Sequence, residues 1–329
     1  RDVAYAAVPI GDRAIRHARF ARWLEEHPER QDDPATIALL AHHYERAVVL
    51  ARSIDQTDAG LATSAFVALL RAARDENRRE GLRRADHWYR RARDLGGPEP
   101  DLLEALAEHG QVLLELRHLD AARDTFEELQ ARAADQPSRM AWAMGHLAAT
   151  TRLGGDLDLA DERFEAAARL ARELDDVHTQ ASQLRLEGWT DLAVGRFRAA
   201  LPRLERAAAL EARHGLDDRR SETLRNLGWC QYLAGDLRAA RGHLVEAMER
   251  EGADDQPGVV AWSAGLLAAT WLHGGQTERS VAITSELRAV SRANGDPWGE
   301  WTCATLEAAG RLALGDVGIA RATALEAIS

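Results

Sequence analysis

The segment LRLEGWTDLAVGRFRAAL begins at Leu184, and the segment LRNLGWCQYLAGDLRAAR, which has Gly, Trp and Ala at the same places, begins 40 residues later at Leu224. A second pair of similar segments consists of QPSRMAWAMGHLAATTRLGGD, from Gln136, and QPGVVAWSAGLLAATWLHGGQ, from Gln256, which are separated by three times that distance. Similar segments that are separated by multiples of one length indicate an internal repeat, and periods of about 20 to 50 residues are typical of solenoid proteins. We therefore read the chain as an array of 40-residue units.

The units can be aligned on a glycine that recurs every 40 residues, at Gly155, Gly195, Gly235, Gly275 and Gly315. A small residue follows each glycine by five positions, at Ala160, Ala200, Ala240, Ser280 and Ala320. Two less regular units surround Ala85 and Ala122, so the chain holds about seven units. Glycine at this place predicts the end of a helix in the left-handed conformation.

Each unit has the pattern of a helix, a tight turn and a second helix. Small residues mark the helix before the turn, at Ala148, Gly188, Gly228, Ala268 and Ala308. After the turn, Phe164, Leu204 and Leu244 follow the small residue by four positions, which places them on the same helix face. Since no stretch alternates with the period of a strand, the sequence predicts an all-α fold.

Composition excludes several classes of protein. The 329 residues include 42 Arg and Lys against 53 Asp and Glu, a net charge of −11, and all 42 basic residues are Arg. This balance argues against direct nucleic-acid binding, because affinity for phosphate backbones comes from cations. No run approaches the ~18 apolar residues of a membrane span. Two Cys, Cys230 and Cys303, cannot build a disulfide framework, and we expect a reducing, cytoplasmic location.

The repeat pattern resembles the tetratricopeptide repeat (TPR) from about Ala65 to Ser329. The matching residues are the small residue of the first helix, the turn glycine and the alanines of the second helix. The resemblance implies a right-handed superhelix of antiparallel helix pairs, with a concave groove lined by the first helices. We assign residues 59–329 to this superhelix, with the last unit cut short.

The start of the chain has a different pattern, RDVAY, RxxRH, WLE and LAHHY within Arg1 to Tyr44. It is similar to the junction after the nucleotide-binding core in STAND signalling ATPases, as in actinobacterial cyclase-type proteins and large LuxR-type transcriptional regulators. The resemblance implies that residues 1–58 are a helical junction and that the ATPase core lies outside this chain. A chain without Lys cannot supply a P-loop lysine.

Tryptophan, arginine and a few polar residues define a candidate binding groove for a peptide or other ligand. In the TPR pattern the position after the small residue faces the groove, which selects Trp189 and Trp229. The predicted set is Trp142, Arg185, Trp189, Arg225, Trp229, Tyr232, Trp262 and His273. Trp, Tyr and Arg dominate interface energies, and Arg stacks on Trp. The alternative is that these indoles pack inside the superhelix; we assign Trp271 to the core in either case.

Other candidate sites have simpler explanations. His42 and His43 are helix neighbours that point about 100° apart, which disfavours a shared metal. Cys230 and Cys303 lack a partner and are expected to be buried structural thiols. Nine Arg against four acids between Arg71 and Arg93 form either a docking patch or a solvated helix face with local ion pairs. We predict no metal and no cofactor.

The sequence therefore predicts a binding domain without enzymatic activity. Its expected partners are a protein or peptide, a small-molecule effector as a further candidate, and the ATPase domain of the same polypeptide, with no membrane contact. Through this binding it would regulate an attached signalling ATPase, cyclase or transcriptional regulator. The alternative is a structural or oligomerisation scaffold that has no small-ligand site.

Overall fold

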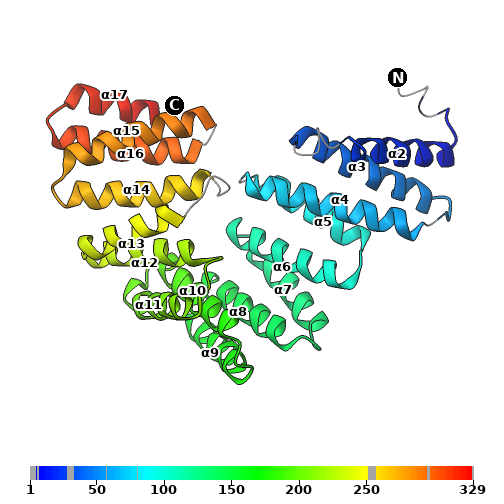
Figure 1. Cartoon of the computed structure of the whole chain (residues 1–329), viewed down its shortest axis with the longest axis horizontal. Coiled ribbons are helices and arrows are strands. Elements are labelled where there is room, and N and C mark those ends of the chain that lie inside the picture. Colours follow the sequence, from blue (N-terminus) through cyan, green and yellow to red (C-terminus); the bar gives the residue numbers. More distant parts are fainter. Residues whose placement is uncertain are drawn as a thin grey trace. The chain divides into compact units, whose positions relative to one another are not determined.

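Figure 1 shows the computed structural model of the chain, which describes residues 5, 7–27, 33–56, 58–79, 81–250, 257–294 and 297–327. These residues form sixteen helices and no strand, which confirms the all-α prediction. Within the same ranges, no helix combines the length and the apolar character that crossing a bilayer requires. The chain divides into two compact units, residues 1–135 and 136–329.

The first unit is a series of helices in which each packs against the next. They are α2 (Ile10–Glu25), α3 (Pro34–Arg52), α4 (Ala59–Arg78), α5 (Leu82–Leu95), α6 (Glu99–Glu115) and α7 (Leu119–Arg132). Helix α3 is packed through a face that includes Ala41, which is fully buried, and Tyr44, which is 2% exposed. Helices α3 and α4 pack together across the junction boundary that the sequence places after residue 58, and that boundary stays a prediction.

The second unit contains five helix pairs. The helices are α8 (Pro137–Leu153), α9 (Leu157–Glu173), α10 (Val177–Ala193), α11 (Phe197–His214), α12 (Arg220–Ala234), α13 (Leu237–Arg250), α14 (Pro257–His273), α15 (Thr277–Asn294), α16 (Pro297–Ala313) and α17 (Val317–Ala327). Successive first helices, from α8 to α16, lie against one another, while each second helix packs on the first helix of its own pair. The predicted helix-pair repeat is present throughout this unit.

The turns inside the pairs have the predicted conformation. All five repeat glycines have positive φ, from 76° at Gly275 to 97° at Gly155. The less regular unit around Ala122 keeps the same turn with Arg117, whose φ is 59°. The turn geometry is therefore retained where the glycine that favours it is absent.

The small residues of the first helices allow close helix contact. A Cβ at Gly188 would lie 2.6 Å from Leu204 Cγ, and a Cβ at Gly228 would lie 2.7 Å from Leu244 Cγ. Ala148 and Ala268 are fully buried at the equivalent positions of their pairs. In the α10–α11 and α12–α13 pairs the two helices therefore approach too closely for a larger residue at the glycine.

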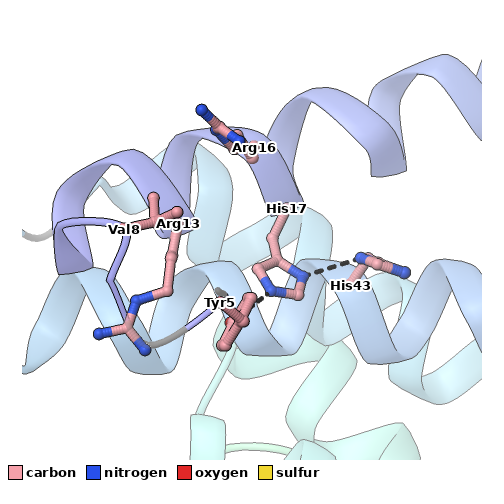
Figure 2. Close-up of a pocket in the computed structure, with 6 residues that line it drawn as sticks. All are labelled: Tyr5, Val8, Arg13, Arg16, His17 and His43. Atoms are coloured by element: carbon pink, nitrogen blue, oxygen red, sulfur yellow. Dashed lines mark hydrogen bonds between the residues drawn. The ribbon is translucent and has the colours of Figure 1, made fainter. Parts of the chain in front are cut away.

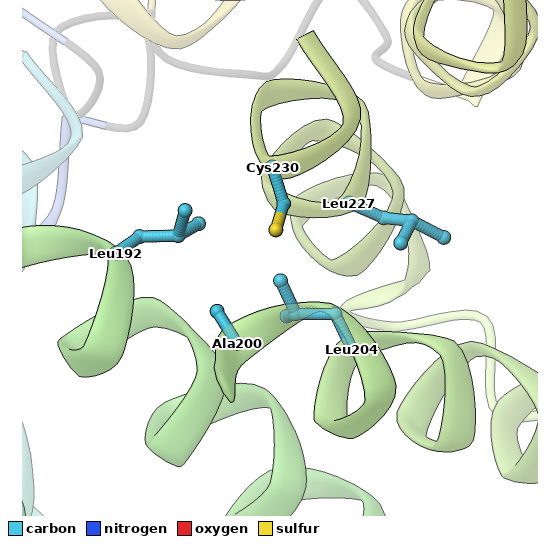
Figure 3. Close-up of a cluster of buried hydrophobic side chains, with 5 residues drawn as sticks. All are labelled: Leu192, Ala200, Leu204, Leu227 and Cys230. Carbon is cyan, nitrogen blue, oxygen red and sulfur yellow. The ribbon is translucent and has the colours of Figure 1, made fainter. Parts of the chain in front are cut away.

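The core connects neighbouring units of the repeat. Figure 3 shows Leu192 of α10, Ala200 and Leu204 of α11, and Leu227 and Cys230 of α12 in one cluster. The Cys230 thiol is fully buried and donates to the Phe197 carbonyl at 2.9 Å, and burial raises its pKa to about 11. Cys230 is therefore a structural residue, and each helix pair completes its core with the next pair.

Candidate functional site

The eight residues of the predicted groove lie on four neighbouring first helices of the second unit: α8, α10, α12 and α14. Trp142, Trp189, Trp229 and Trp262 are all half-buried, while the alanines and glycines that pack each first helix on its partner are buried. We call the surface formed by the eight predicted residues the first-helix face. The tryptophans of this face are neither core residues nor freely exposed side chains.

A polar cluster joins Arg185 of α10 with Glu211 of α11 and with Glu222 and Thr223 of α12. Arg185 is 13% exposed and forms ion pairs with Glu211 Oε1 at 3.3 Å and Glu222 Oε2 at 3.6 Å. Glu211 also accepts a hydrogen bond from Thr223 Oγ1 at 2.7 Å. The sequence predicts an exposed cation here, but the structure holds this guanidinium between two carboxylates. Arg185 is therefore an oriented donor rather than a free charge.

Arg225 belongs to the same electrostatic environment. Burial raises the pKa of Glu222, but Arg185, Arg219 and Arg225 outweigh it and hold this pKa below its usual value. Glu222 is absent from the predicted groove set, although its equivalence to Trp142 and Trp262 by multiples of 40 residues is visible in the sequence. Because Glu222 lies among these arginines, the face that was predicted to be cationic carries charges of both signs.

Trp142 stacks on His146, with ring centroids 3.5 Å apart and an interplanar angle of 27°. His146 is 4% exposed, and its Nδ1 lies 3.0 Å from the Trp142 carbonyl oxygen. Burial lowers the pKa of His146 to about 3, with a further contribution from Arg185 and Arg219. At neutral pH the imidazole of His146 is uncharged and packs against the indole ring of Trp142.

Trp229 and Trp262 form the aromatic part of the face. Their rings meet edge to face with centroids 5.4 Å apart, an arrangement that aromatic pairs prefer. Trp271 lies in the core beside them at 8% exposure, which confirms its sequence assignment, and Arg279 stacks over its ring at 4.3 Å. The indoles of Trp229 and Trp262 thus pack against the core and are themselves only partly buried.

Tyr232 and His273 also meet, at the ends of α12 and α14. The Tyr232 hydroxyl oxygen lies 3.1 Å from His273 Nδ1, and burial raises the pKa of the tyrosine. Trp189 is half-buried on α10. The structure therefore brings together Trp229 with Trp262 and Tyr232 with His273, and it pairs Arg185 with two acids, whereas Trp189 belongs to none of these groups.

The arginine-rich segment is largely neutralised in the structure. Among the described residues, acidic side chains form ion pairs with at least seven of its nine arginines: Arg74, Arg78, Arg79, Arg84, Arg90, Arg91 and Arg93. Several partners come from other helices, such as Glu45 for Arg91 and Glu128 for Arg93. These pairs favour the interpretation of a solvated helix face over that of a docking patch.

A second cluster, around His17 in the first unit, is missing from the predicted site. His17 of α2 meets His43 of α3, with their Nδ1 atoms 2.8 Å apart. The RxxRH motif places Arg13, Arg16 and His17 on one helix face, which is the sequence signal for this cluster. No group of three His, Cys, Asp or Glu side chains in the described ranges has a geometry suited to a metal ion.

Comparisons with known proteins support the fold. The chain matches no family model and no curated protein sequence. Among solved structures, a Rap protein complexed with Competence and Sporulation Factor superposes with a TM-score of 0.58 at 11% identity, covering 97% of this chain and 96% of that one.

Two further structures are similar. A STAND protein with a tetratricopeptide repeat sensor from Pyrococcus horikoshii has a TM-score of 0.56 at 11% identity, covering 90% of this chain and 52% of that one. TPR-like repeats of a kinesin light chain from Podospora anserina give a TM-score of 0.52 at 17% identity, covering 58% of this chain and 93% of that one. The chain therefore has a TPR-like fold.

The buried histidines predict how stability depends on pH. Burial lowers the pKa of His109 to about 4 and that of His146 to about 3. Because the fold keeps both imidazoles neutral, their contribution to stability is complete above pH ~6.5 and is lost as the pH falls towards these values. At pH 5 each histidine is expected to lower the free energy of unfolding by about 2 kcal/mol.

Urea unfolding of His146→Gln at pH 7 and pH 5 measures this effect. The loss on acidification is expected to be about 2 kcal/mol smaller in the variant than in the wild type. His214→Gln, at an exposed position of α11, is the control and should leave the loss unchanged. Equal losses in His146→Gln and wild type would contradict the assignment.

Proposed function

We propose that the first-helix face of the second unit binds a peptide or an extended protein segment. The observation that carries the proposal is the set of four half-buried tryptophans on the neighbouring first helices α8, α10, α12 and α14, together with an Arg185 guanidinium on α10 that is fixed by Glu211 and Glu222. Rigid indoles offer a large contact area at low entropic cost, and oriented polar groups give direction. This combination is typical of recognition surfaces.

Charge and ring geometry indicate which segment fits. The Arg185 cluster contains both signs of charge. It can therefore form hydrogen bonds with both the N–H and the carbonyl groups of a peptide backbone, and it does not require a charged ligand. The edge-to-face pair of Trp229 and Trp262 offers aromatic surface against which an apolar or aromatic side chain can pack. We infer a ligand with one or two apolar anchors. The similar Rap protein in complex with its factor supports this class of function.

Regulation of an attached signalling ATPase, cyclase or transcriptional regulator is the wider role that we propose. It is supported by the resemblance of the first 58 residues to a STAND junction and by the similar repeat sensor of the Pyrococcus protein. In this arrangement the repeat unit would bind the partner, and the attached ATPase, cyclase or transcriptional regulator would change its activity. The proposed domain has a binding role and no catalytic one.

Peptide selection tests the binding proposal. Random peptides displayed on phage are selected on the whole chain, and their affinities are then measured for variants. Trp189→Leu is expected to weaken the selected peptides at least tenfold, because the indole supplies contact area on the face. Trp301→Leu, at a 49% exposed position of α16 outside the predicted set, is the control and should change affinity less than twofold.

Equal binding of the selected peptides to wild type and to Trp189→Leu would overturn the proposal. Circular dichroism checks that the variant retains its helices. If selection yields no peptide that binds the wild type, the first-helix face is not a peptide site.

A scaffold function is the second candidate, favoured by apolar exposure on α16 and α17. Leu312, Val317, Ile319 and Leu325 are 50% to 61% exposed, and they offer a surface for a second copy of the chain. Light scattering after size exclusion should then show a dimer that Val317→Glu dissociates. A monomer at high concentration would contradict this candidate.

A further inference from the structure

One side of α2 in the first unit carries exposed apolar side chains. Ile15, Phe20 and Trp23 are 50%, 38% and 41% exposed, whereas Ala18 and Ala21 on the other side of the helix are buried. Helix α2 packs against α3. Single exposed apolar residues are common on protein surfaces, but several on one face indicate an interaction surface.

Arginines lie between these apolar residues. Helix α2 has an arginine at every third position from residue 13 to residue 22. Ile15, Arg19 and Trp23 are spaced by four residues, as are Arg16 and Phe20, so basic and apolar side chains share one face of the helix. We call these five residues the α2 outer face.

The arginines of α2 are not neutralised within the protein. Among the described residues, none of the four forms an ion pair with an acidic side chain, whereas at least seven of the nine in the Arg71–Arg93 segment do. Asp12 and Glu26 are exposed near the two ends of the helix. The α2 outer face between them therefore carries only positive charge.

The arginines also point in different directions. Figure 2 shows the side chains of Arg13 and Arg16 diverging, and the guanidinium carbon of Arg13 lies 5.1 Å from the centroid of the Tyr5 ring. Two diverging guanidinium groups cannot enclose one small anion. A partner that neutralises the face must instead offer several carboxylates, each of which reaches a separate arginine.

The aromatic rings of this face are held in place by their neighbours. The ring centroid of Phe20 lies 4.6 Å from that of His43 and 5.7 Å from that of Trp23. The Trp23 ring in turn lies 4.3 Å from the ring of His27. Rings that are already fixed lose little conformational entropy when a partner packs on their exposed parts.

We propose that the α2 outer face docks an acidic amphipathic helix of a protein partner. Carboxylates of that helix would pair with Arg16 and Arg19, and its apolar side chains would pack on Ile15, Phe20 and Trp23. Arginine and aromatic residues are enriched at the core of protein interfaces. An uncharged apolar partner would remove the arginines from water without supplying a counter-charge, which is unfavourable.

The dimensions of the face suit a helix. Residues 15 and 23 are eight positions apart, which is about 12 Å along the axis of α2, so two or three turns of a partner helix cover the face. Helices pack on one another through ridges and grooves of their side chains, as α2 already does on α3. The partner helix would add one more layer to this series.

The buried side of α2 argues against a lipid surface as the occupant. An amphipathic helix binds a bilayer by inserting its broad apolar side. In α2 that side contains Ala14, Ala18 and Leu24, which are already buried within the fold. The α2 outer face lies in the first unit, and it does not depend on the peptide-binding proposal for the second unit.

Selection of displayed helices tests the proposal. A library of peptides of about 15 residues, long enough to form a helix, varies its surface positions among Glu, Gln, Lys and Leu. It is depleted on the Arg16→Gln/Arg19→Gln variant, which removes peptides that bind elsewhere, and is then selected on the wild-type chain. The enriched peptides are expected to carry Glu and Leu on one helix face.

Affinities of the enriched peptides, measured by fluorescence anisotropy, separate the contributions of charge and ring contact. Arg16→Gln/Arg19→Gln is expected to weaken binding at least tenfold, and added salt should weaken binding to the wild type. Trp23→Ser should also weaken it at least tenfold, because the indole supplies contact area. The control Arg206→Gln/Arg213→Gln removes two exposed arginines of α11 and should change affinity less than twofold. Circular dichroism checks that each variant keeps its helices.

Four results would overturn the proposal. The first is a selection that enriches no peptide after depletion. The second is a set of enriched peptides without an excess of Glu, which would indicate a purely apolar contact. The third is an equal loss in the α2 and α11 double variants, which would indicate general charge attraction. The fourth is sedimentation of the wild type with phosphatidylglycerol vesicles that Arg16→Gln/Arg19→Gln abolishes, which would assign the face to a lipid surface.

Discussion

Replacement of Arg152 by Met is expected to lower the free energy of unfolding by about 3 kcal/mol at pH 7. Arg152 is fully buried at the end of α8, where its guanidinium forms ion pairs with Asp161, with Asp191 Oδ1 at 3.1 Å and with Glu187 Oε1 at 3.8 Å. The guanidinium carbon of Arg152 also lies 4.6 Å from the centroid of the Phe164 ring. Met fills much of the same volume but leaves three carboxylates with less positive charge.

The remaining charges explain why the loss depends on pH. Arg196 and Arg203 still neutralise part of the acidic group, with Arg203 Nη1 3.0 Å from Asp191 Oδ2. Burial already raises the pKa of Asp191 and Glu187, against the influence of Arg152 and Arg203. In the variant these carboxyl groups take up protons more readily, so the loss measured by urea unfolding should be smaller at pH 5 than at pH 7.

Arg196→Met is the matched control for Arg152→Met. Arg196 contacts the same Asp161 and Asp191, but its side chain is 29% exposed. Water can replace part of its interaction, so the expected loss is about 1 kcal/mol. Equal losses of unfolding free energy in the two variants would contradict the larger effect that we attribute to the burial of Arg152.

The second large effect concerns the close contact within a helix pair. Gly228→Ala is expected to lower the free energy of unfolding by about 2 kcal/mol, although alanine is the better helix former. The new Cβ would lie 2.7 Å from Leu244 Cγ and 3.2 Å from the Ala240 carbonyl oxygen. Because one of these atoms belongs to the backbone, a rotation of Leu244 cannot relieve the whole clash.

Gly242→Ala in α13 is the control, since a Cβ there meets no atom within 4 Å. It should raise the free energy of unfolding by roughly 0.5–1 kcal/mol, because alanine restricts the unfolded chain and favours the helix. In a Leu244→Ala background, Gly228→Ala should cost less than in the wild type. Stabilisation by Gly228→Ala in the native background would contradict the close-contact interpretation.

The repeat, its turns and its packing positions are predictable from the sequence because they rest on local rules. A glycine every 40 residues marks a left-handed turn, and a small residue at a fixed place in the first helix marks close packing. Arg117 shows the limit of the rule, since its turn keeps the same geometry without a glycine. The assignment of Trp271 to the core follows from the same repeat phase.

The candidate sites could be predicted only in part. The register of the repeat places Trp142, Trp189, Trp229 and Trp262 on neighbouring first helices, but it does not show that Glu211 and Glu222 surround Arg185. Those acids come from α11 and α12, and their distance from α10 depends on how the helices pack. Whether a charged side chain is free or paired is a property of that packing.

Periodicity in the chain determines an all-α, TPR-like array, because each helix pair exposes an apolar face that only the next pair can cover. The tertiary structure decides which polar groups meet across helices. It buries Arg152 among three acids, pairs most arginines of the Arg71–Arg93 segment, and brings His43 of α3 to the Arg13–His17 face of α2. Interactions between charges and rings depend on distances of a few ångström between segments remote in sequence, and the repeat pattern does not encode those distances.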